Sequence, residues 1–593
     1  MTIPVRSYLA LLGRYLRPQW RRVLVLAVLL LAAIGLQLIG PQILRAFVDT
    51  ATGGHALGIT NASSSLTLLP LLFLATALAG QIVSLAETYM AENVGWLATN
   101  RLRNDLMLHC LRLDMGFHNQ HTPGELIERI DGDVSLLANF FARFVVQVLG
   151  NALLMVGVLV LLFRIHWLVG ATFTGFAVLA LAVLSRVQGL AASRWVASRQ
   201  SSAALFGFLE ERLSGTEDVR SAGATPFMVR RLLGLMRDLL QKERRAALLG
   251  GILGNTLNVT FMLVTAAAFV LGAYLFHAGT ITLGTVYLIL NYTQLLRQPI
   301  DQLNRHVLDL QRATAGIARI RQLLEMRNAL PELDGGIGRN GKIAVLPPGP
   351  LAVELDHVTF GYHAGEPVLH DVGLTVPAGK VLGVLGRTGS GKTTIARLLF
   401  RLYDPDAGAL RLGGVDVGAV PRAELTRRVG MITQEVQLFH ATVRDNLALF
   451  DRTVPDAAIL VALQDLGLKR WYRSLPKGLD TPLAGGGGLS AGEAQLLAFV
   501  RVFLKDPGLV ILDEATSRLD PATEALLERA VSKLLQGRTG IVVAHRLSTV
   551  QRADDVLILE QGRVVEYGPR SRLAGDPGSR FAVLLRSGAE VAV

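Results

Sequence analysis

Six long apolar stretches in the first half of the chain limit what it can fold into. They lie near residues 23–48, 66–90, 140–163, 166–187, 250–276 and 280–296. A helix needs about 20 mostly apolar residues to cross a bilayer, and these stretches qualify. They could instead be buried helices of a large soluble core, but the run from Val23 to Leu36 is apolar on every face of a helix. The sequence therefore predicts six membrane-spanning helices in contact with a lipid bilayer.

The distribution of charge agrees with a membrane domain. Only 18% of the 593 residues are charged, against about 25% in an ordinary soluble protein. The net charge of +12 would suggest a nucleic-acid partner, but residues 50–65 and 276–284 contain no Lys or Arg. The basic residues instead gather before the first stretch, after the second, and between the fourth and fifth. Because positive residues stay on the cytoplasmic side, we predict cytoplasmic termini and no nucleic-acid partner.

Breaks in composition predict how the chain is organised. The expected parts are an amphipathic elbow helix at 1–20, a membrane domain at 21–326, a Gly/Pro-rich linker at 327–350 and a domain of alternating strands and helices with ordinary soluble composition at 351–593. Cytoplasmic segments near 91–139 and 188–248 keep a helical pattern, so the spanning helices are expected to continue beyond the membrane. The chain lacks organelle-targeting features, which favours the inner membrane of a bacterium.

A glycine-rich loop follows an apolar strand in the second half of the chain. The run Gly386-Arg387-Thr388-Gly389-Ser390-Gly391-Lys392-Thr393 matches the pattern G-x-x-x-x-G-K-S/T and comes directly after Val381–Leu385. Such glycines let backbone N–H groups converge on phosphate oxygens, the lysine reaches the β/γ-phosphates, and the threonine hydroxyl holds Mg²⁺. We therefore predict that this loop, with Thr394, binds ATP and that Thr393 is a Mg²⁺ ligand.

Two further strands end in residues suited to nucleotide hydrolysis. The strand Leu509–Leu512 ends in Asp513 and Glu514. An acid at such a strand end can hold Mg²⁺ through water, and the next acid can orient or deprotonate an attacking water. His545 follows the strand Ile541–Ala544, where an imidazole could contact the γ-phosphate. A lone histidine is more often structural, but its place in this series favours a catalytic role.

In this combination and order, the motifs resemble those of the ATP-binding cassette (ABC) family. Six spans followed by a cassette resemble an ABC half-transporter of the exporter type over essentially the whole chain. The resemblance implies a multidomain membrane protein, with an all-α six-helix transmembrane domain plus an α/β P-loop ATPase cassette that has a helical subdomain. It also implies ATP hydrolysis coupled to transport, and a second half-transporter as partner.

The resemblance implies roles for residues outside the phosphate loop. By motif, Tyr362 would stack on adenine, and Gln434 would lie near Mg²⁺ and serve catalysis. Ser490 and Gly492 would contact nucleotide from the signature segment. Asp520 would lie in the D-loop, and His545 would be the switch histidine. Arg518 stands where the family usually has alanine. The segments Phe117–Glu125 and Phe206–Gly215 resemble the two regions that couple the membrane domain to the cassettes.

The signature segment departs from the family pattern. It reads Leu489-Ser490-Ala491-Gly492-Glu493 where Leu-Ser-Gly-Gly-Gln is usual. Ala491 adds a Cβ where the backbone approaches a ligand. Glu493 adds a negative charge, which costs about 2 kcal/mol per unit charge at roughly 8 Å from an anion. We therefore favour a heterodimer with one degenerate ATP site, and tolerated variation in a working homodimer is the alternative.

Polar side chains inside the apolar stretches bear on the cargo. Gln37, Glu87, Gln147 and Asn151 are among them, and contacts between helices are favoured over substrate contact for any single one. A mostly apolar wall with scattered amides favours export of amphiphilic molecules such as drugs, lipids or peptides. Two alternatives stay open: an exporter-fold importer, for example of a metal chelate, and an ATP-gated or regulatory protein without net transport.

Overall fold

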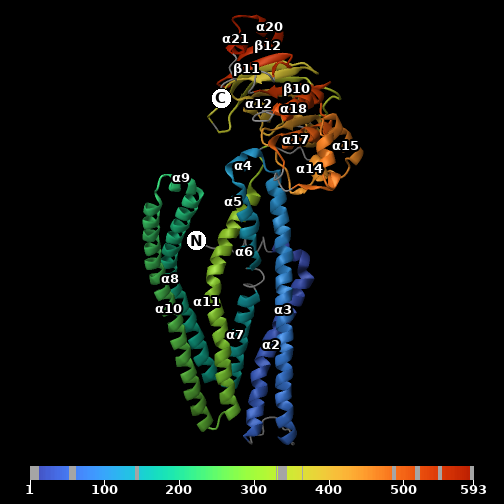
Figure 1. Cartoon of the computed structure of the whole chain (residues 1–593). Helices are drawn as coiled ribbons and strands as arrows, with labels where there is room; N and C mark the ends of the chain where they lie inside the picture. Colours follow the sequence, from blue (N-terminus) through green and yellow to red (C-terminus); the bar gives the residue numbers. More distant parts are fainter. Residues whose placement is uncertain are drawn as a thin grey trace. The chain divides into compact units, whose positions relative to one another are not determined.

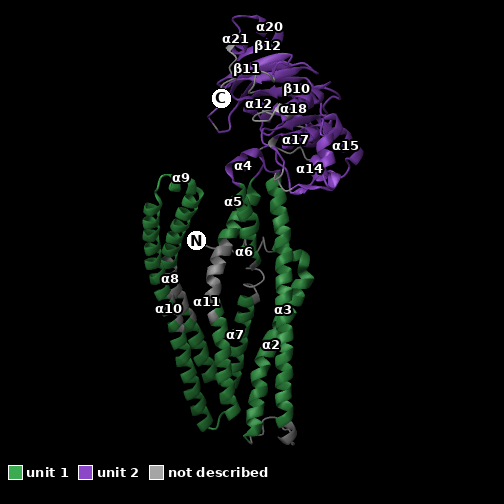
Figure 2. Ribbon diagram, viewed as in Figure 1, with its two compact units in different colours: residues 1–111, 123–326 green, residues 112–122, 327–593 purple. Residues whose placement is uncertain are grey.

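The chain forms two compact units, coloured separately in Figure 2. The computed structural model describes residues 13–52, 62–139, 146–328, 330, 344–363, 365–483, 489–513, 521–544 and 550–587. Unit 1 comprises Met1–Leu111 and Pro123–Met326, and unit 2 comprises Arg112–Thr122 and Arg327–Val593. Most of the predicted elbow helix and linker lies outside the described residues. The predicted membrane domain is interrupted by residues 112–122, which group with unit 2.

Unit 1 is helical (Figure 1). Its long helices in the described chain are α2 (Trp20–Ala51), α3 (Ala62–Arg112), α7 (Val146–Ile165), α8 (Trp167–Ser214), α10 (Thr225–His277) and α11 (Leu283–Glu325). Its short elements are η1 (Arg17–Gln19), α5 (Pro123–Ile127), η2 (Glu128–Asp133), α6 (Val134–Asn139) and α9 (Thr216–Ser221). The six long helices correspond in order to the six predicted spans.

Four helices are long and apolar enough, within the described residues, to cross a membrane. These segments are Gly13–Ala51, Leu66–Arg112, Gln147–Ile165 and Asn258–His277. A shorter apolar section, Trp167–Ala180, begins α8, and the next part of that predicted span has side chains that are not described. The first half of α11 is more polar because it contains Asn291, Gln294 and Arg297.

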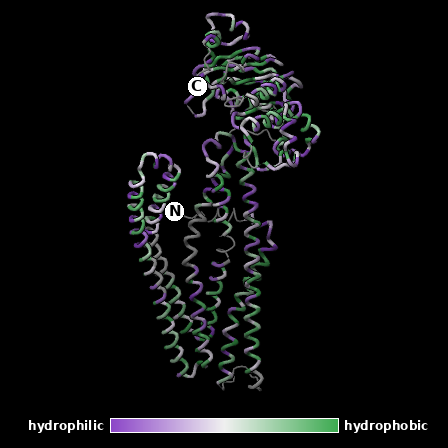
Figure 3. The backbone as a smooth tube through the Cα atoms, viewed as in Figure 1, coloured by the Kyte–Doolittle hydropathy of each residue, from purple (hydrophilic) through white to green (hydrophobic). Residues whose placement is uncertain are grey.

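Helices α8 and α10 form a long hairpin with α9 at its turn (Figure 1). They contain 48 and 53 residues, which gives lengths of about 70–80 Å at 1.5 Å per residue. This exceeds the roughly 30 Å hydrocarbon core of a bilayer, and hydrophilic residues gather around α9 (Figure 3). Helix α8 ends at Ser214, so all of the predicted coupling segment Phe206–Gly215 except its last residue lies in the final turns of α8, and the turn begins at Gly215.

Polar contacts join α2 to α11 inside unit 1. Tyr292 is fully buried, and its hydroxyl accepts a hydrogen bond from Gln42 Nε2 at 2.8 Å. Closer to the C-terminal end of α2, the buried carboxylate of Asp49 accepts hydrogen bonds from Gly284 N at 2.8 Å and Thr282 Oγ1 at 2.9 Å. Asp49 thus pairs an N–H group in the first turn of α11, whose N-cap is Thr282. These bonds assign Gln42 and Tyr292 to contacts between helices.

Unit 2 is built around two main sheets. The four-stranded sheet has the order β2-β1-β4-β5, and the six-stranded sheet has the order β12-β11-β3-β10-β9-β6. The strands are β1 (Val353–Phe360), β2 (Leu369–Val376), β3 (Val381–Leu385), β4 (Ala407–Leu412), β5 (Val415–Asp416), β6 (Val429–Ile432), β9 (Leu509–Asp513), β10 (Thr539–Val543), β11 (Asp555–Glu560) and β12 (Arg563–Pro569). All strands of the six-stranded sheet are parallel except the edge strand β12. Runs such as Leu509–Leu512 are buried on both faces, as parallel sheets require.

Helices pack around the two sheets. The helices of unit 2 in the described residues are α4 (Met115–Gln120), α12 (Lys392–Leu399), α13 (Arg422–Arg428), α14 (Val443–Ala448), α15 (Asp456–Asp465), α16 (Lys469–Ser474), α17 (Ala491–Lys505), α18 (Pro521–Leu535), α20 (Arg570–Gly575) and α21 (Arg580–Ser587), with the short turns η4 (Val417–Ala419) and η5 (Gly478–Asp480). The two-residue strands β7 (Ala441–Thr442) and β8 (Pro482–Leu483) pair with each other. Leu463, Phe499 and Leu527 join α15, α17 and α18 in one buried cluster, which also includes Ile432 of β6 and Val510 of β9. The helices of the predicted helical subdomain therefore pack against the six-stranded sheet.

Candidate ATP site and membrane cavity

Three parallel strands end side by side in unit 2. β10 lies between β3 and β9, and Val543 pairs with Val384 on one side and with Asp513 on the other. β6, which precedes Gln434, is the next neighbour of β9. Parallel α/β sheets bind ligands beyond the carboxyl ends of their strands. The fold therefore brings the glycine-rich loop, Asp513 and the segment containing Gln434 to one edge of the sheet.

The glycine-rich loop has a backbone that needs its glycines. Gly386, Gly389 and Gly391 all have positive φ angles, of 153°, 80° and 101°, and such angles are costly for other residues. A Cβ on Gly386 would also collide with the carbonyl oxygen of Leu559. Gly391 is the N-cap of α12, so the first N–H groups of that helix point into the loop. This arrangement attracts an anion.

Lys392 and Ser390 complete the loop. The buried Lys392 ammonium donates hydrogen bonds to the carbonyl oxygens of Gly386 at 2.6 Å and Arg387 at 3.0 Å. The hydroxyl of Ser390 is buried and has no hydrogen-bond partner among the described residues. A buried hydroxyl without a partner is unfavourable unless a ligand completes it. The residues present therefore fit the triphosphate of ATP.

Two oxygen ligands suited to Mg²⁺ meet beside the loop. Thr393 Oγ1 donates a hydrogen bond to Asp513 Oδ1 at 3.3 Å, and the Asp513 side chain is buried at the end of β9. Hydroxyl, carboxylate and phosphate oxygens are the ligands that Mg²⁺ prefers. These two residues therefore fit the metal.

Tyr362 lies in an aromatic cluster beside α12. Its ring meets those of Phe360 and Tyr403 edge-on, with centroids 5.1 and 5.2 Å away. Its hydroxyl lies 3.2 Å from Thr394 Oγ1 and accepts a hydrogen bond from Arg397 Nη1 at 3.2 Å. The ring is half-buried, so part of its surface is available to a base. Its stacking on adenine stays a prediction.

Of the remaining predicted site residues Gln434, Glu514, Asp520 and His545, the structure describes only Gln434. Gln434 is exposed and lies two residues beyond β6. Glu514, Asp520 and His545 lie outside the described residues. The structure does describe β9 up to Asp513 and β10 up to Val543, so the strands that lead to Glu514 and His545 are adjacent.

The signature segment forms the start of α17. Ser490 is the N-cap, and its hydroxyl accepts a hydrogen bond from Glu493 N at 3.2 Å. The carboxylate of Glu493 accepts one in return from Ser490 N at 2.8 Å. This reciprocal pair is a capping box. The Ser490 N–H therefore already donates to the negatively charged carboxylate of Glu493. The departure of this segment from the family signature did not predict this local role. Gly492 lies in the first turn of α17, where it is buried.

Comparison with known proteins identifies the family. Residues 23–300 match the family model described as "ABC transporter transmembrane region", and residues 369–517 match the model described as "ABC transporter". A fatty acid ABC transporter ATP-binding/permease protein of Mycobacterium bovis is 31% identical over 536 residues, which cover 90% of this chain and 83% of that protein. The chain belongs to the ABC transporter family.

Other similarities define the type of this ABC transporter. It is 28% identical over 574 residues to an ATP-dependent lipid A-core flippase of Alcanivorax borkumensis, with 95% of this chain and 94% of the flippase covered. A solved structure of a bacterial Atm1-family ABC exporter with ATP bound matches with a TM-score of 0.79 at 25% identity, covering 97% of this chain and 99% of that chain. This ABC transporter is therefore an exporter-type half-transporter that dimerises in a membrane and couples ATP hydrolysis to transport.

The segment around α4 contributes a contact that the sequence did not predict. Asn119 Nδ2 donates a hydrogen bond to the hydroxyl of Tyr403 at 2.7 Å, within unit 2. Tyr403 in turn packs against Tyr362, whose hydroxyl lies beside Thr394. The contact joins the first predicted coupling segment of this ABC transporter to the aromatic cluster beside the ATP loop. The only sequence signal was an aromatic residue shortly after α12.

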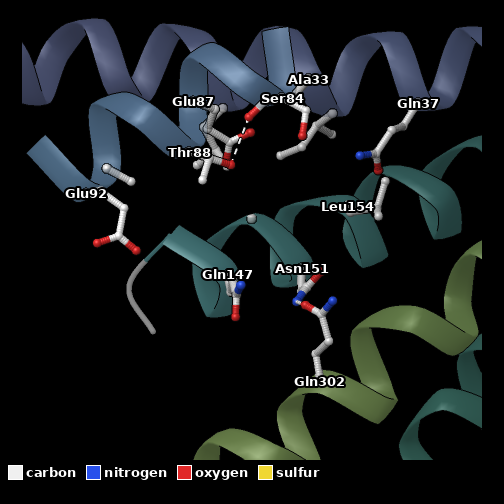
Figure 4. A pocket seen from close by; sticks show the side chains of 14 residues that line it. Ala33, Gln37, Ser84, Glu87, Thr88, Glu92, Gln147, Asn151, Leu154 and Gln302 are labelled. Carbon is white, nitrogen blue, oxygen red and sulfur yellow. Dashed lines mark hydrogen bonds between the residues drawn. The ribbon is translucent and has the colours of Figure 1, made fainter. Parts of the chain in front are cut away.

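A cavity of about 400 Å³ lies between helices α2, α3, α7 and α11 of unit 1. Its polar lining, shown in Figure 4, consists of Gln37, Ser84, Glu87, Thr88, Glu92, Gln147, Asn151 and Gln302. Asn151 Nδ2 donates a hydrogen bond to Gln302 Oε1 at 2.5 Å, which joins α7 to α11. Leu30, Ile34 and Leu154 are among the apolar residues of the wall. The structure thus gathers four polar residues named from the sequence around one cavity.

Proposed function

We propose that this chain is one half of a heterodimeric exporter of amphiphilic molecules in the bacterial inner membrane, with both termini in the cytoplasm. The observation that supports this cargo is the cavity in unit 1, whose wall contains leucines and an isoleucine together with amides and two carboxylates. Such a wall can hold an apolar body and bind polar groups at chosen points. The similarity to a fatty acid transporter and to a lipid A-core flippase supports the same class.

In the proposed ATP site, each residue has one task. Lys392 and the N–H groups from Gly386 to Thr394 bind the phosphates, and Tyr362 stacks on adenine. Thr393, Asp513 and Gln434 would hold Mg²⁺, which neutralises phosphate charge when bound. Glu514 orients the attacking water, and His545 contacts the γ-phosphate. ATP binds the closed dimer better than the open one and therefore shifts the population toward the closed state. Hydrolysis removes this preference and returns the dimer to the open state.

The signature of this chain serves the partner's ATP site in the proposed dimer, together with Asp520. The hydroxyl of Ser490 remains able to donate to a phosphate, but its N–H is already bound to the Glu493 carboxylate. That carboxylate also repels an incoming triphosphate. We therefore infer that the ATP site closed by this signature is the degenerate one. The site that contains Glu514 would be completed by a partner with a better signature.

The experiment that tests export uses full-length protein in inside-out vesicles. ATP added outside should drive accumulation of a fluorescent amphiphile, and Lys392→Ala should abolish it because ATP no longer binds. Accumulation only in right-side-out cells would instead establish import. ATP hydrolysis without any solute flux would establish a regulatory role.

The experiment that tests the heterodimer is native mass spectrometry of the complex isolated from its own host, with ATPase activity measured on the same sample. An active complex with a different half-transporter is expected. An active dimer of this chain alone would contradict the proposal.

In the expected heterodimer, the double change Ala491→Gly with Glu493→Gln should leave the complex active. A many-fold rise in ATP hydrolysis would instead show that this signature limits the working site.

A further inference from the structure

Two cavities lie near the start of α2 in unit 1; they share Arg22, and the second also shares Glu92 with the cavity described above. The first, of about 470 Å³, is lined by Pro18, Gln19, Trp20, Arg21, Arg22 and Arg101. The second, of about 490 Å³, shares Arg22 and includes Tyr89, Trp96 and Leu97 of α3. The hydrogen bond from the hydroxyl of Tyr15 to Asp105 Oδ2, at 2.8 Å, holds the segment before α2 against α3. The walls of both cavities are therefore fixed by packing within unit 1.

Gln19 indicates that the first cavity is incomplete without a ligand. Only 6% of the surface of Gln19 is exposed. Neither its Nε2 nor its Oε1 atom has a hydrogen-bond partner among the described residues. Buried amides are almost always hydrogen-bonded in folded proteins. An amide without a partner in the wall of a cavity therefore calls for a polar group inside that cavity.

The charge of the first cavity defines the ligand as an anion. Arg21, Arg22 and Arg101 line it, and none of its described lining residues carries a carboxylate. Arginines bind phosphate oxygens with paired N–H groups. An excess of arginine beside a spanning helix also follows from membrane topology alone. Topology does not explain why an unpartnered glutamine is buried among those arginines.

The second cavity defines the rest of the ligand. Tyr89, Trp96 and Leu97 give it a largely apolar wall beside Arg22, which lines both cavities. Its other lining residues are Glu92, Asn93 and Asn100. Trp20 and Trp96 are more than half exposed, and both are residue types that gather at membrane interfaces. The first cavity lies near the beginning of the candidate span Gly13–Ala51. A molecule with a phosphate beside an acyl chain matches this pair of cavities.

We propose that these cavities bind one anionic phospholipid of the cytoplasmic leaflet. Its phosphate lies among Gln19, Arg22 and Arg101, with the Gln19 amide as donor, and its acyl chain lies against Trp96 and Leu97. Anionic lipids of that leaflet are attracted by basic pockets near spanning helices. The site does not depend on the direction of transport or on the identity of the cargo.

The test measures lipid retention and thermal stability of the full-length protein after delipidation in detergent. Phosphatidylglycerol, phosphatidylcholine or sodium phosphate is added, and native mass spectrometry counts the bound lipids. Phosphatidylglycerol should remain bound at one copy and raise Tm by about 2 °C or more. Phosphatidylcholine and phosphate should have little effect. An equal effect of inorganic phosphate, or of phosphatidylcholine, would overturn the assignment to an anionic lipid.

Variants separate a binding site from a structural one. Arg22→Gln with Arg101→Gln should weaken phosphatidylglycerol binding by about tenfold or more, whereas Arg230→Gln on α10 is the matched control and should not. Gln19→Leu removes an amide without a partner, so it should raise Tm without lipid and abolish the further rise with phosphatidylglycerol. If Gln19→Leu lowered Tm equally with and without lipid, Gln19 would be structural and the proposal would be wrong. Retained ATP hydrolysis verifies that each variant is folded.

Discussion

At the scale of single residues, polar side chains at the ends of strands stabilise the six-stranded sheet of unit 2. Asp554 lies just before β11 and accepts hydrogen bonds from Val381 N at 2.9 Å and Lys380 Nζ at 3.0 Å. Burial alone would raise the pKa of the Asp554 carboxyl, but these two donors outweigh burial and lower it below the ordinary value of 3.8. Asp554 thereby holds the start of β3, the strand that leads to the ATP loop.

Asp554→Asn should lower the stability of the cassette at pH 7 by about 0.5–1 kcal/mol, because the pair is partly exposed to solvent. The folded-state pKa lies below the unfolded-state value, so the stabilisation is complete above that value and is lost as the pH falls through the folded-state pKa. The measurement is Tm of both proteins from pH 7 down to about pH 3. Their difference should shrink below about pH 4. Asp465→Asn, at an exposed position of α15, is the control for the loss of one carboxylate elsewhere in the cassette.

Glu514→Gln should abolish ATP hydrolysis and preserve ATP binding, because the amide cannot orient or deprotonate water as the carboxylate does. Binding of labelled ATP and release of phosphate measure the two effects. Lys392→Ala is the comparison, since it should lose binding as well. Hydrolysis above about a tenth of the unchanged protein would count against Glu514 as the essential residue.

At the scale of elements, α17 shows how one residue can serve two purposes. The capping box between Ser490 and Glu493 satisfies two N–H groups that the start of a helix leaves unpaired. The same carboxylate places a negative charge in the signature segment. Local helix stability and the binding of a triphosphate therefore make opposite demands on residue 493.

Ser490→Ala should destabilise α17 by about 1 kcal/mol, because the N-cap hydroxyl is lost. Glu493→Gln should change stability much less, since a glutamine side chain can complete the same capping box without the charge. Thermal unfolding of both variants compares them directly. If Glu493→Gln destabilised the protein as much as Ser490→Ala, the negative charge itself, near the positive end of the helix dipole, would be the main stabilising feature.

At the scale of the whole molecule, the chain passes between its two units more than once. Residues 112–122 belong to unit 2 although the residues on both sides belong to unit 1. Their contact with the cassette includes the hydrogen bond from Asn119 to Tyr403. This contact lies beside Tyr362 and α12, so movement of the ATP loop can reach the segment that continues into unit 1.

Tyr403→Phe should reduce transport by about fivefold and leave ATP hydrolysis without cargo nearly unchanged. The change removes one hydrogen bond, worth about 1 kcal/mol, and keeps the ring that packs against Phe360 and Tyr362. Transport into inside-out vesicles and ATP hydrolysis are measured on the same sample. Tyr472→Phe on α16 is the matched control. An equal loss of both activities would show that Tyr403 only stabilises the ATP site.

The sequence by itself determined the features that depend on local pattern. Apolar length predicted the long helices, since a helix that crosses a membrane must satisfy its own backbone. The spacing of Gly386, Gly391 and Lys392 predicted the phosphate loop, because its backbone angles are set within a few residues. The family resemblance supplied the roles of Glu514, Asp520 and His545, which the described residues do not place.

Only the tertiary structure decided which distant residues meet. Asn151 and Gln302 are 151 positions apart, and no local pattern indicates that their amides share a cavity. The same holds for Asn119 with Tyr403. The unpartnered Gln19 is also invisible in sequence, because burial depends on what packs around a residue. Local patterns specify elements, whereas sites between elements arise from packing, which brings together residues whose separation in the chain carries no signal.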